Sequence, residues 1–370
     1  MNTSVLLFNC VLLFILIALS QSKGELKLLL AVFRHGDRTP DWLPQWYPND
    51  PYNSDDWYPV PDGGLTNIGK QGAYNLGTFF RRRYDKFLGH DTRPDVVKFF
   101  SSHSDRAKLS GQLVASGLYP PQPHEKWNNA LDWQPIFINS APSVDEAWFY
   151  FSSVGLCSNH KRQQKLLETT DPEFIKYLDS NKEFYDFISN HAGINGTYEL
   201  AYVLYVTIIA EVEMGLAPPT WTQGLLPEGK LKDAAGKVFE IRGLNDELKK
   251  IAAGVWLKMW LEKVEDFISG KFPRQKALFW SGHDQNVGDM LVALGAFEEP
   301  HVPAYNSAIM LELHQIGAEY YVKVLYKRDV YVEPLFIPGC DDLICPLETF
   351  KKKFAPILPE DPRGACGELL

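Results

Sequence analysis

The sequence predicts an α/β protein in which helices flank a mostly parallel central sheet, with a smaller helical cap domain inserted into it. Strand and helix patterns alternate along residues 25–139, which is typical of right-handed βαβ crossovers. Helical patterns dominate from about 140 to 270, and strand patterns return after that. We therefore assign residues 23–139 and 271–370 to one α/β domain and residues 140–270 to the cap.

The chain begins with an apolar leader. Residues 5–19 are apolar and are followed by small residues around Ser20 and Ser22, which is the pattern of a signal peptide and its cleavage site. We predict a signal peptide over residues 1–22. The alternative is an N-terminal membrane anchor, for which the apolar run is short. We expect no membrane anchor in the mature chain, and therefore secretion, with the lysosomal lumen as the alternative destination.

The N-terminal half supplies the first predicted strands and helices. Residues 25–33 and 95–101 are apolar runs typical of strands. A helix is predicted over residues 66–84, with Thr66 as its N-cap, and a second helix follows the second strand. Residues 41–64 hold five prolines, three tryptophans and three tyrosines without periodicity. We predict a long loop that forms a rim over a site, the alternative being a loop that only packs on the surface.

Helical periodicity marks three segments of the predicted cap, namely 172–190, 199–215 and 244–269. Beyond the cap, residues 277–281 form a core strand pattern, and a helix is predicted over about 285–295. Residues 307–314 and 319–327 alternate like a hairpin around Gly317. The C-terminal part of the chain is therefore expected to complete the sheet.

A cluster of charged residues follows the first predicted strand directly. Arg34 and Arg38 lie on either side of His35, and Gly36 allows the backbone to turn sharply. Open α/β sheets bind ligands at the carboxyl ends of their strands. Two planar guanidinium groups match the oxygens of a phosphate dianion, and histidine can act as a nucleophile or as an acid and base. This stretch therefore predicts a site of phosphoryl transfer.

A second cluster, Ser281-Gly282-His283-Asp284, also stands between a strand and a helix. Both turns should project from the same sheet edge, so that His35 and Asp284 face each other across a bound phosphate. We predict that His35, kept neutral by nearby arginines, attacks phosphorus to give a phosphohistidine. Asp284 would protonate the leaving alcohol and then activate water. The predicted phosphate ligands are Arg34, Arg38, Arg106 and His283.

Other classes of ligand are disfavoured. The net charge of −9 argues against a nucleic-acid binder. A metal site built from His35, Asp37, His283 and Asp284 is an alternative, but three arginines in the same pocket would repel a divalent cation. We therefore expect no metal and no cofactor.

Cysteine usage agrees with a secretory chain. Five cysteines become four if Cys10 leaves with the signal peptide, and an even number suggests two disulfides. Cys340 and Cys345 are close enough to close a small loop, which would leave Cys157 to pair with Cys366, although four cysteines allow three pairings. The sequon at Asn195 would carry a glycan in the secretory pathway.

At these motifs the chain resembles the histidine acid phosphatase family, including its prostatic, lysosomal and insect secreted or venom branches. The family signature R-H-G-x-R-x-P stands here at residues 34–40, and its distal His-Asp pair at His283-Asp284. The resemblance covers Glu25 to Cys366. It implies a phosphoglycerate-mutase-like fold with a smaller helical domain, His35 as nucleophile, Asp284 as proton donor and the phosphate ligands named above. It also supports the disulfide pairs Cys157–Cys366 and Cys340–Cys345, and it is compatible with a homodimer.

The chain departs from the family in two places. Phe100-Ser101-Ser102 stands where relatives usually have R-S-T, and the vertebrate enzymes carry six cysteines, which implies that one bridge is absent here. The expected function is an acid phosphatase that hydrolyses small phosphate monoesters without a metal. The alternatives are a specialised lysophospholipid or inositol-phosphate phosphatase, and a catalytically idle secreted binding protein.

Overall fold

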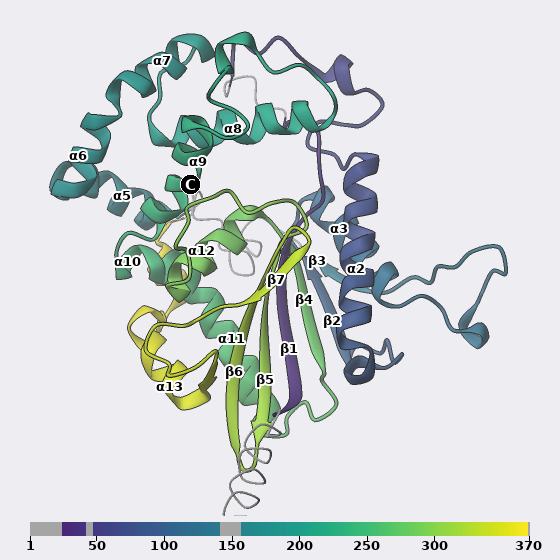
Figure 1. Ribbon diagram of the computed structural model, residues 1–370. Helices are drawn as coiled ribbons and strands as arrows, with labels where there is room; N and C mark the ends of the chain where they lie inside the picture. The colour runs from purple at the N-terminus through teal and green to yellow at the C-terminus, as the bar shows by residue number, and fades with distance from the viewer. Residues whose placement is uncertain (1–23, 42–46, 141–156, 369–370) are drawn as a thin grey trace, which may run out of the picture.

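An eight-stranded mixed sheet forms the centre of the computed structural model, which describes residues 24–41, 47–140 and 157–368 (Figure 1). The strand order is β3-β2-β4-β1-β5-β6-β7, and β8 pairs with β6. The strands are β1 (Glu25–Arg34), β2 (Val97–Ser101), β3 (Ile138–Ser140), β4 (Ala277–Gly282), β5 (Ala308–Ile316), β6 (Glu319–Arg328), β7 (Tyr331–Pro334) and β8 (Ile344–Pro346).

The core strands are parallel, as predicted. β1 pairs with β4, β4 with β2 and β2 with β3, all in parallel. The predicted hairpin of β5 and β6 lies against β1 on the other side, where every pairing is antiparallel. Strands β3, β7 and β8 were not predicted, since each has only three or four residues and so carries too short a pattern.

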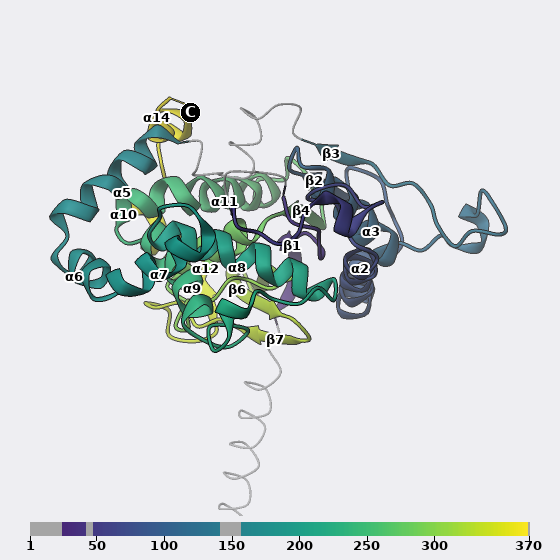
Figure 2. The ribbon, with the colours of Figure 1, turned by 90° about the horizontal axis from the view of Figure 1, so that it is seen from above.

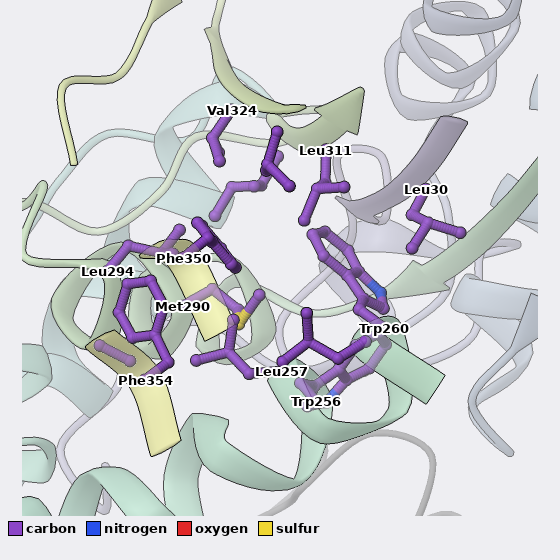
Figure 3. Packing of buried hydrophobic residues seen from close by; sticks show 14 of the residues in the cluster. Leu30, Trp256, Leu257, Trp260, Met290, Leu294, Leu311, Val324, Phe350 and Phe354 are labelled. Atoms are coloured by element: carbon purple, nitrogen blue, oxygen red, sulfur yellow. The ribbon is translucent and has the colours of Figure 1, made fainter. Parts of the chain in front are cut away.

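Two apolar cores cover the two faces of the sheet, because successive side chains of a strand point to opposite faces. On β1, Leu28, Leu30 and Val32 join one core, while Leu29, Ala31 and Phe33 join the other. The first core receives α11 (Val255–Ile268), α12 (Asp284–Leu294) and α13 (Leu347–Phe354). Figure 3 shows Trp256 and Trp260 of α11 in this core, close to Leu30 and Leu311 of the sheet.

The second core receives α2 (Asn67–Leu88) and α3 (Asp105–Leu118). The predicted N-cap is confirmed, since Thr66 Oγ1 accepts a hydrogen bond of 3.0 Å from the backbone of Gly69. The helix runs four residues beyond the predicted end at residue 84, although Tyr84 itself departs from helical angles. The loop over residues 41–64 contains only one short 3₁₀ turn, Ser54–Trp57, among its described residues.

The helices of the predicted cap lie over one end of the sheet (Figures 1 and 2). They are α5 (Ser158–Thr170), α6 (Pro172–Ser180), α7 (Lys182–Ala192), α8 (Tyr198–Glu213) and α9 (Lys230–Arg242). The prediction of one helix over 172–190 was wrong. Asn181 adopts non-helical angles and donates a side-chain hydrogen bond of 2.9 Å to the carbonyl of Tyr177, which ends α6 before α7 begins.

The predicted helix over 244–269 consists of three consecutive pieces. They are α10 (Asp246–Lys249), a π-helical turn (Lys250–Gly254) and α11. Since α11 packs its tryptophans against the sheet, its packing favours a helical insertion that ends before residue 250. The assignment of residues 140–270 to a cap domain, including its end at residue 270, therefore stays a prediction.

Two disulfides tie down the C-terminal part of the chain. Cys157 pairs with Cys366 in α14 (Pro362–Cys366), and Cys340 pairs with Cys345, which confirms both predicted pairs. The predicted signal peptide lies outside the described residues. Within the described part of the chain, none of the helices combines the length and the apolar character that crossing a bilayer requires.

Candidate active site

The two predicted clusters lie side by side because β1 and β4 are neighbours in the sheet. Their parallel register pairs Phe33 with Ser281 and Arg34 with Gly282, so the segments that follow the two strands leave the sheet at the same edge. The backbone N–H of His35 donates to the carbonyl of Gly282 at 3.0 Å. The His35 and His283 rings lie 5.4 Å apart, centroid to centroid.

All six predicted site residues line one cleft of about 620 Å³. Its wall also includes residues 61–64, the end of the long loop, in agreement with the predicted rim. The loop is held there by backbone hydrogen bonds from Thr39 to Gly64 and from Gly63 to Pro40. Helix α8 contributes Tyr202 and Val206 from the opposite side.

Two glycines allow the motif turn to pack against the start of α2. A Cβ atom at Gly36 would lie 2.2 Å from the carbonyl oxygen of Gly69, and one at Gly69 would lie 2.0 Å from the carbonyl oxygen of Asp37. Neither position has space for a side chain. The backbone N–H of Gly36 also donates to Ser110 Oγ at 3.0 Å, which fixes the turn against α3.

His35 is held in one tautomer by its two hydrogen bonds. Nδ1 lies 2.8 Å from the carbonyl oxygen of Gly36, which can only accept, so Nδ1 carries the proton. Nε2 accepts from Nε of Arg106 at 3.1 Å, so its lone pair is directed at another residue of the cleft wall. Burial, followed by the positive charges of Arg106 and Arg34, holds the pKa of His35 well below its ordinary value. The imidazole is therefore a neutral base at acidic pH.

Arg34 is fixed from three sides. Its Nη1 donates to the carbonyl of Pro303 at 2.6 Å, its guanidinium lies 3.8 Å above the centre of the Tyr305 ring, and its Nη2 is 3.3 Å from Asp284. A guanidinium held in this way has its orientation set before any anion arrives, so little ordering remains to be done on binding.

Asp41 is a site residue that the sequence analysis missed. One of its carboxylate oxygens lies 2.9 Å from Nη1 of Arg106, and the other lies 3.5 Å from Nη2 of Arg38. Its carboxylate therefore bridges two of the three arginines that were predicted to bind phosphate. Its place directly after the signature gave no signal by itself, because its partner Arg106 is distant in sequence.

His283 stands at the N-terminus of α12, where its backbone N–H donates to the side chain of Asn286 at 2.9 Å. Its Nε2 lies 2.9 Å from Oγ of Ser102, a residue of the segment that departs from the family pattern. Burial and the charge of Arg106 lower the pKa of His283 to about 3. The ring is therefore neutral, and it can contribute an N–H but no positive charge to a bound phosphate.

Asp284 begins α12 and is surrounded by donors. Its carboxylate contacts Arg34 and accepts from the backbone of Gln285 at 2.8 Å. Each of its two oxygens lies 3.2 Å from the hydroxyl of Tyr202. Burial favours the neutral carboxyl, but Arg34, Arg38 and the backbone hydrogen bond from Gln285 outweigh it, so the pKa of Asp284 lies below its ordinary value. Tyr202 was not predicted as a site residue, because α8 is a mainly apolar helix whose contacts the sequence does not reveal.

The metal-site alternative gains nothing from this arrangement. Asp37, one of its four proposed ligands, is not among the residues that line the cleft. Within the described ranges of the chain, no group of three histidine, cysteine, aspartate or glutamate side chains is placed to hold a metal ion.

The family model of the histidine phosphatase superfamily (branch 2) matches residues 25–327, which includes both clusters. The chain belongs to this superfamily. It is 35% identical over 349 residues to the venom acid phosphatase Acph-1 of Apis mellifera, with 93% of this chain and 88% of that protein covered. It is 30% identical over 366 residues to the prostatic acid phosphatase of Homo sapiens, with 96% and 91% covered.

The fold of this histidine phosphatase also matches solved structures. The phytase of Hafnia alvei in complex with tartrate aligns with a TM-score of 0.66 over 92% of this chain and 98% of that one, at 18% sequence identity. At such low identity the match shows the shared fold alone. The family and the named relatives together make this chain a phosphatase enzyme.

Proposed function

We propose that this histidine phosphatase is an acid phosphatase that hydrolyses phosphate monoesters through a phosphohistidine at His35, without a metal. The observation that carries the proposal is the neutral imidazole of His35, whose Nε2 lone pair accepts from Arg106 in a cleft lined by three arginines. A dianionic phosphoryl group repels nucleophiles, and arginines can neutralise it and hold it in line with the attacking nitrogen.

In the first step, Nε2 of His35 attacks phosphorus, and the bond between phosphorus and the ester oxygen breaks. The leaving oxygen takes a proton from the carboxyl of Asp284, which lines the same cleft beside Arg34. The products of this step are the free alcohol, a phosphohistidine and an ionised Asp284. General acid assistance of this kind is worth about 10²- to 10⁴-fold in rate.

In the second step, the carboxylate of Asp284 takes a proton from water, and the water oxygen attacks phosphorus as the bond to Nε2 breaks. Inorganic phosphate leaves, and both His35 and Asp284 return to their starting forms. Arg34, Arg38, Arg106 and the N–H of His283 would hold the phosphoryl oxygens in both steps. Arg106 would exchange its hydrogen bond to His35 for one to the phosphate.

An acidic pH optimum follows from the protonation state that Asp284 requires as a general acid. The residue must carry a proton before the first step, yet Arg34 and Arg38 favour its ionised form in the empty cleft. A bound phosphate dianion offsets these positive charges and makes the protonated carboxyl easier to form. Activity should therefore be high at acidic pH and fall as the pH rises through the pKa of Asp284 in the substrate complex.

We propose small phosphate monoesters as substrates. The cleft walls carry Asp41, Asp62 and Asp105 beside the arginines, and such carboxylates would repel the additional phosphates of a highly phosphorylated compound. An inositol-polyphosphate or lysophospholipid substrate is the competing proposal. A binding protein without turnover would have no need of an acid at Asp284.

The remaining proposals concern the setting in which the enzyme works. Two disulfides are typical of the secretory pathway, and the relatives include venom, prostatic and lysosomal phosphatases, so secretion and the lysosomal lumen are the two proposed locations. Asn195 is exposed, as a glycosylation site must be. A homodimer stays a prediction from the family resemblance.

The proposal is tested by phosphate release from p-nitrophenyl phosphate near pH 5, with a chelator present, for the wild type and His35→Ala. We expect turnover that resists the chelator and that falls by at least about 10³-fold in the variant. A folded wild type without turnover would overturn the general phosphatase function. Activity that survives in His35→Ala would mean that another group is the nucleophile.

A further inference from the structure

One residue of the helical insertion reaches the proposed proton donor. Tyr202 lies on α8, and its hydroxyl is 3.2 Å from each of the two carboxylate oxygens of Asp284. Its ring packs edge-on against Phe239 of α9, at 5.8 Å between centroids. The phenol is therefore fixed by the packing of two helices of the insertion, while the carboxylate belongs to the α/β domain.

Charged groups from several elements surround Asp284. Arg34 and Arg38 act from the motif turn, Arg106 from α3, and Arg242 from α9, and all four favour the ionised carboxylate. His283, the preceding residue, is neutral and adds no charge. Asp289 of α12 opposes them, but it is itself paired with Arg242 at 2.7 Å. Tyr305 stacks on Arg34 near the carboxylate.

Tyr202 differs from these charged groups because it is neutral and is not an expected ligand of phosphate. The arginines of the motif turn and of α3 are the expected ligands of phosphate, so a substrate would draw their charge away from Asp284. Tyr202 is neutral, and burial together with the neighbouring carboxylate raises the pKa of its phenol, so it keeps its proton. Its hydrogen bond can persist when the phosphoryl group is bound.

We propose that Tyr202 is a positioning residue for Asp284, whose hydroxyl orients the carboxyl group and stabilises the charge that Asp284 acquires when it gives its proton to the leaving alcohol. This inference rests on the proposed function of Asp284 as general acid. In the first step the proton moves from Asp284 to the leaving oxygen, and the carboxylate that remains accepts from Tyr202. In the second step the carboxylate takes a proton from water, and Tyr202 stays protonated throughout.

The consequence is a constraint on the working pH of the enzyme. A donor to the carboxylate stabilises its ionised form, so Tyr202 holds the proton affinity of Asp284 down and confines activity to acidic pH. Without the hydroxyl, Asp284 would stay protonated at higher pH but would be a weaker acid. The loss should matter most for substrates whose leaving group needs a proton.

The test compares Tyr202→Phe with the wild type, because this variant removes the hydroxyl and keeps the ring on Phe239. We expect the alkaline limb of the kcat–pH profile to move upward by about one pH unit. At the acidic optimum, kcat should fall about tenfold for an alkyl phosphate, whose leaving group needs protonation, and much less for p-nitrophenyl phosphate, whose leaving group does not.

Tyr205→Phe is the matched control. Tyr205 lies on the same helix, and among the described residues its hydroxyl makes no hydrogen bond to Asp284. Its variant should keep the wild-type profile. An unchanged alkaline limb in Tyr202→Phe, or an equal loss for both substrates, would overturn the role of Tyr202 while leaving the phosphatase function intact. An inactive wild type would instead overturn the proposed function.

Discussion

Asp41 and Asp284 place two carboxylates among the arginines of the cleft, and their roles differ. Asp284 begins a helix and contacts the backbone of Gln285 and the side chain of Arg34. Asp41 pairs with two arginine side chains of the site, Arg106 and Arg38. In the empty cleft, Asp41 therefore occupies guanidinium N–H groups that a phosphate would need.

We predict that Asp41→Asn binds phosphate more tightly. Removing one negative charge from between Arg38 and Arg106 leaves both guanidinium groups freer to bind a dianion. We expect the KM for p-nitrophenyl phosphate and the inhibition constant of inorganic phosphate to fall by about threefold. Steady-state kinetics near pH 5 measures both constants.

Asp62→Asn is the control for this prediction. Asp62 also lines the cleft, but its carboxylate accepts from Ser54 and Trp57 instead of pairing with an arginine. Its variant should leave the inhibition constant of phosphate near the wild-type value. Weaker phosphate binding in Asp41→Asn would show that Asp41 orders the arginines more than it competes with the ligand.

At the scale of the elements, two carboxyl groups lie close together, that of Asp50 in the long loop and that of Glu211 in α8. Glu211 of α8 is fully buried, and burial together with the nearby carboxylate of Asp50 raises its pKa to about 9. Asp50 is part of a loop segment that is anchored by hydrogen bonds from Tyr52 to Ala217 and from Asn49 to His191. A protonated Glu211 can donate to Asp50 and so hold the segment on the insertion.

Because of this pair, we predict that Glu211 contributes more to the stability of the folded protein at acidic pH than at neutral pH. The folded-state pKa of Glu211 lies above the ordinary value of 4.5, so its contribution to stability is full below that value and is lost as the pH rises toward 9. Glu211→Gln carries a permanent N–H donor. We expect its melting temperature to exceed that of the wild type at pH 7.5 by about 2 °C or more, with a smaller difference at pH 5.

Thermal unfolding at the two pH values measures this effect, with Glu199→Gln on the exposed side of the same helix as control. The control should change little at either pH. If Glu211→Gln lowered the melting temperature equally at pH 5 and pH 7.5, Glu211 would act through packing and not through its proton.

The elements that the sequence predicted well are those with long, regular patterns. The strand over residues 25–33, the helix capped by Thr66 and the hairpin around Gly317 all have enough residues for their periodicity to be clear. The break at Asn181 was not predicted. An asparagine inside an apolar helical pattern can continue the helix or end it, and the hydrogen bond to Tyr177 that ends it here is visible only in the structure. The same limit hid Asp41 and Tyr202, whose partners come from distant segments.

At the scale of the whole molecule, the site exists because the chain returns to its first strand after the helical insertion. β4 enters the sheet between β1 and β2, and this places His283 and Asp284 beside Arg34 and His35. The predicted meeting of the two clusters needed only the rule that parallel strands end at a common edge. The insertion then lies over this edge and contributes Tyr202 (Figure 1).

We propose that His35 carries the phosphoryl group between the two steps. The most direct measurement is rapid-quench trapping of the phosphoenzyme in Asp284→Ala with p-nitrophenyl phosphate. This substrate forms the intermediate without a proton donor, while hydrolysis of the intermediate lacks its base and slows. We predict a burst of p-nitrophenol and an acid-labile, alkali-stable phosphoryl group on the peptide that contains His35. A phosphoryl group on another residue, or turnover in the wild type with none trapped in the variant, would mean that His35 is not the nucleophile.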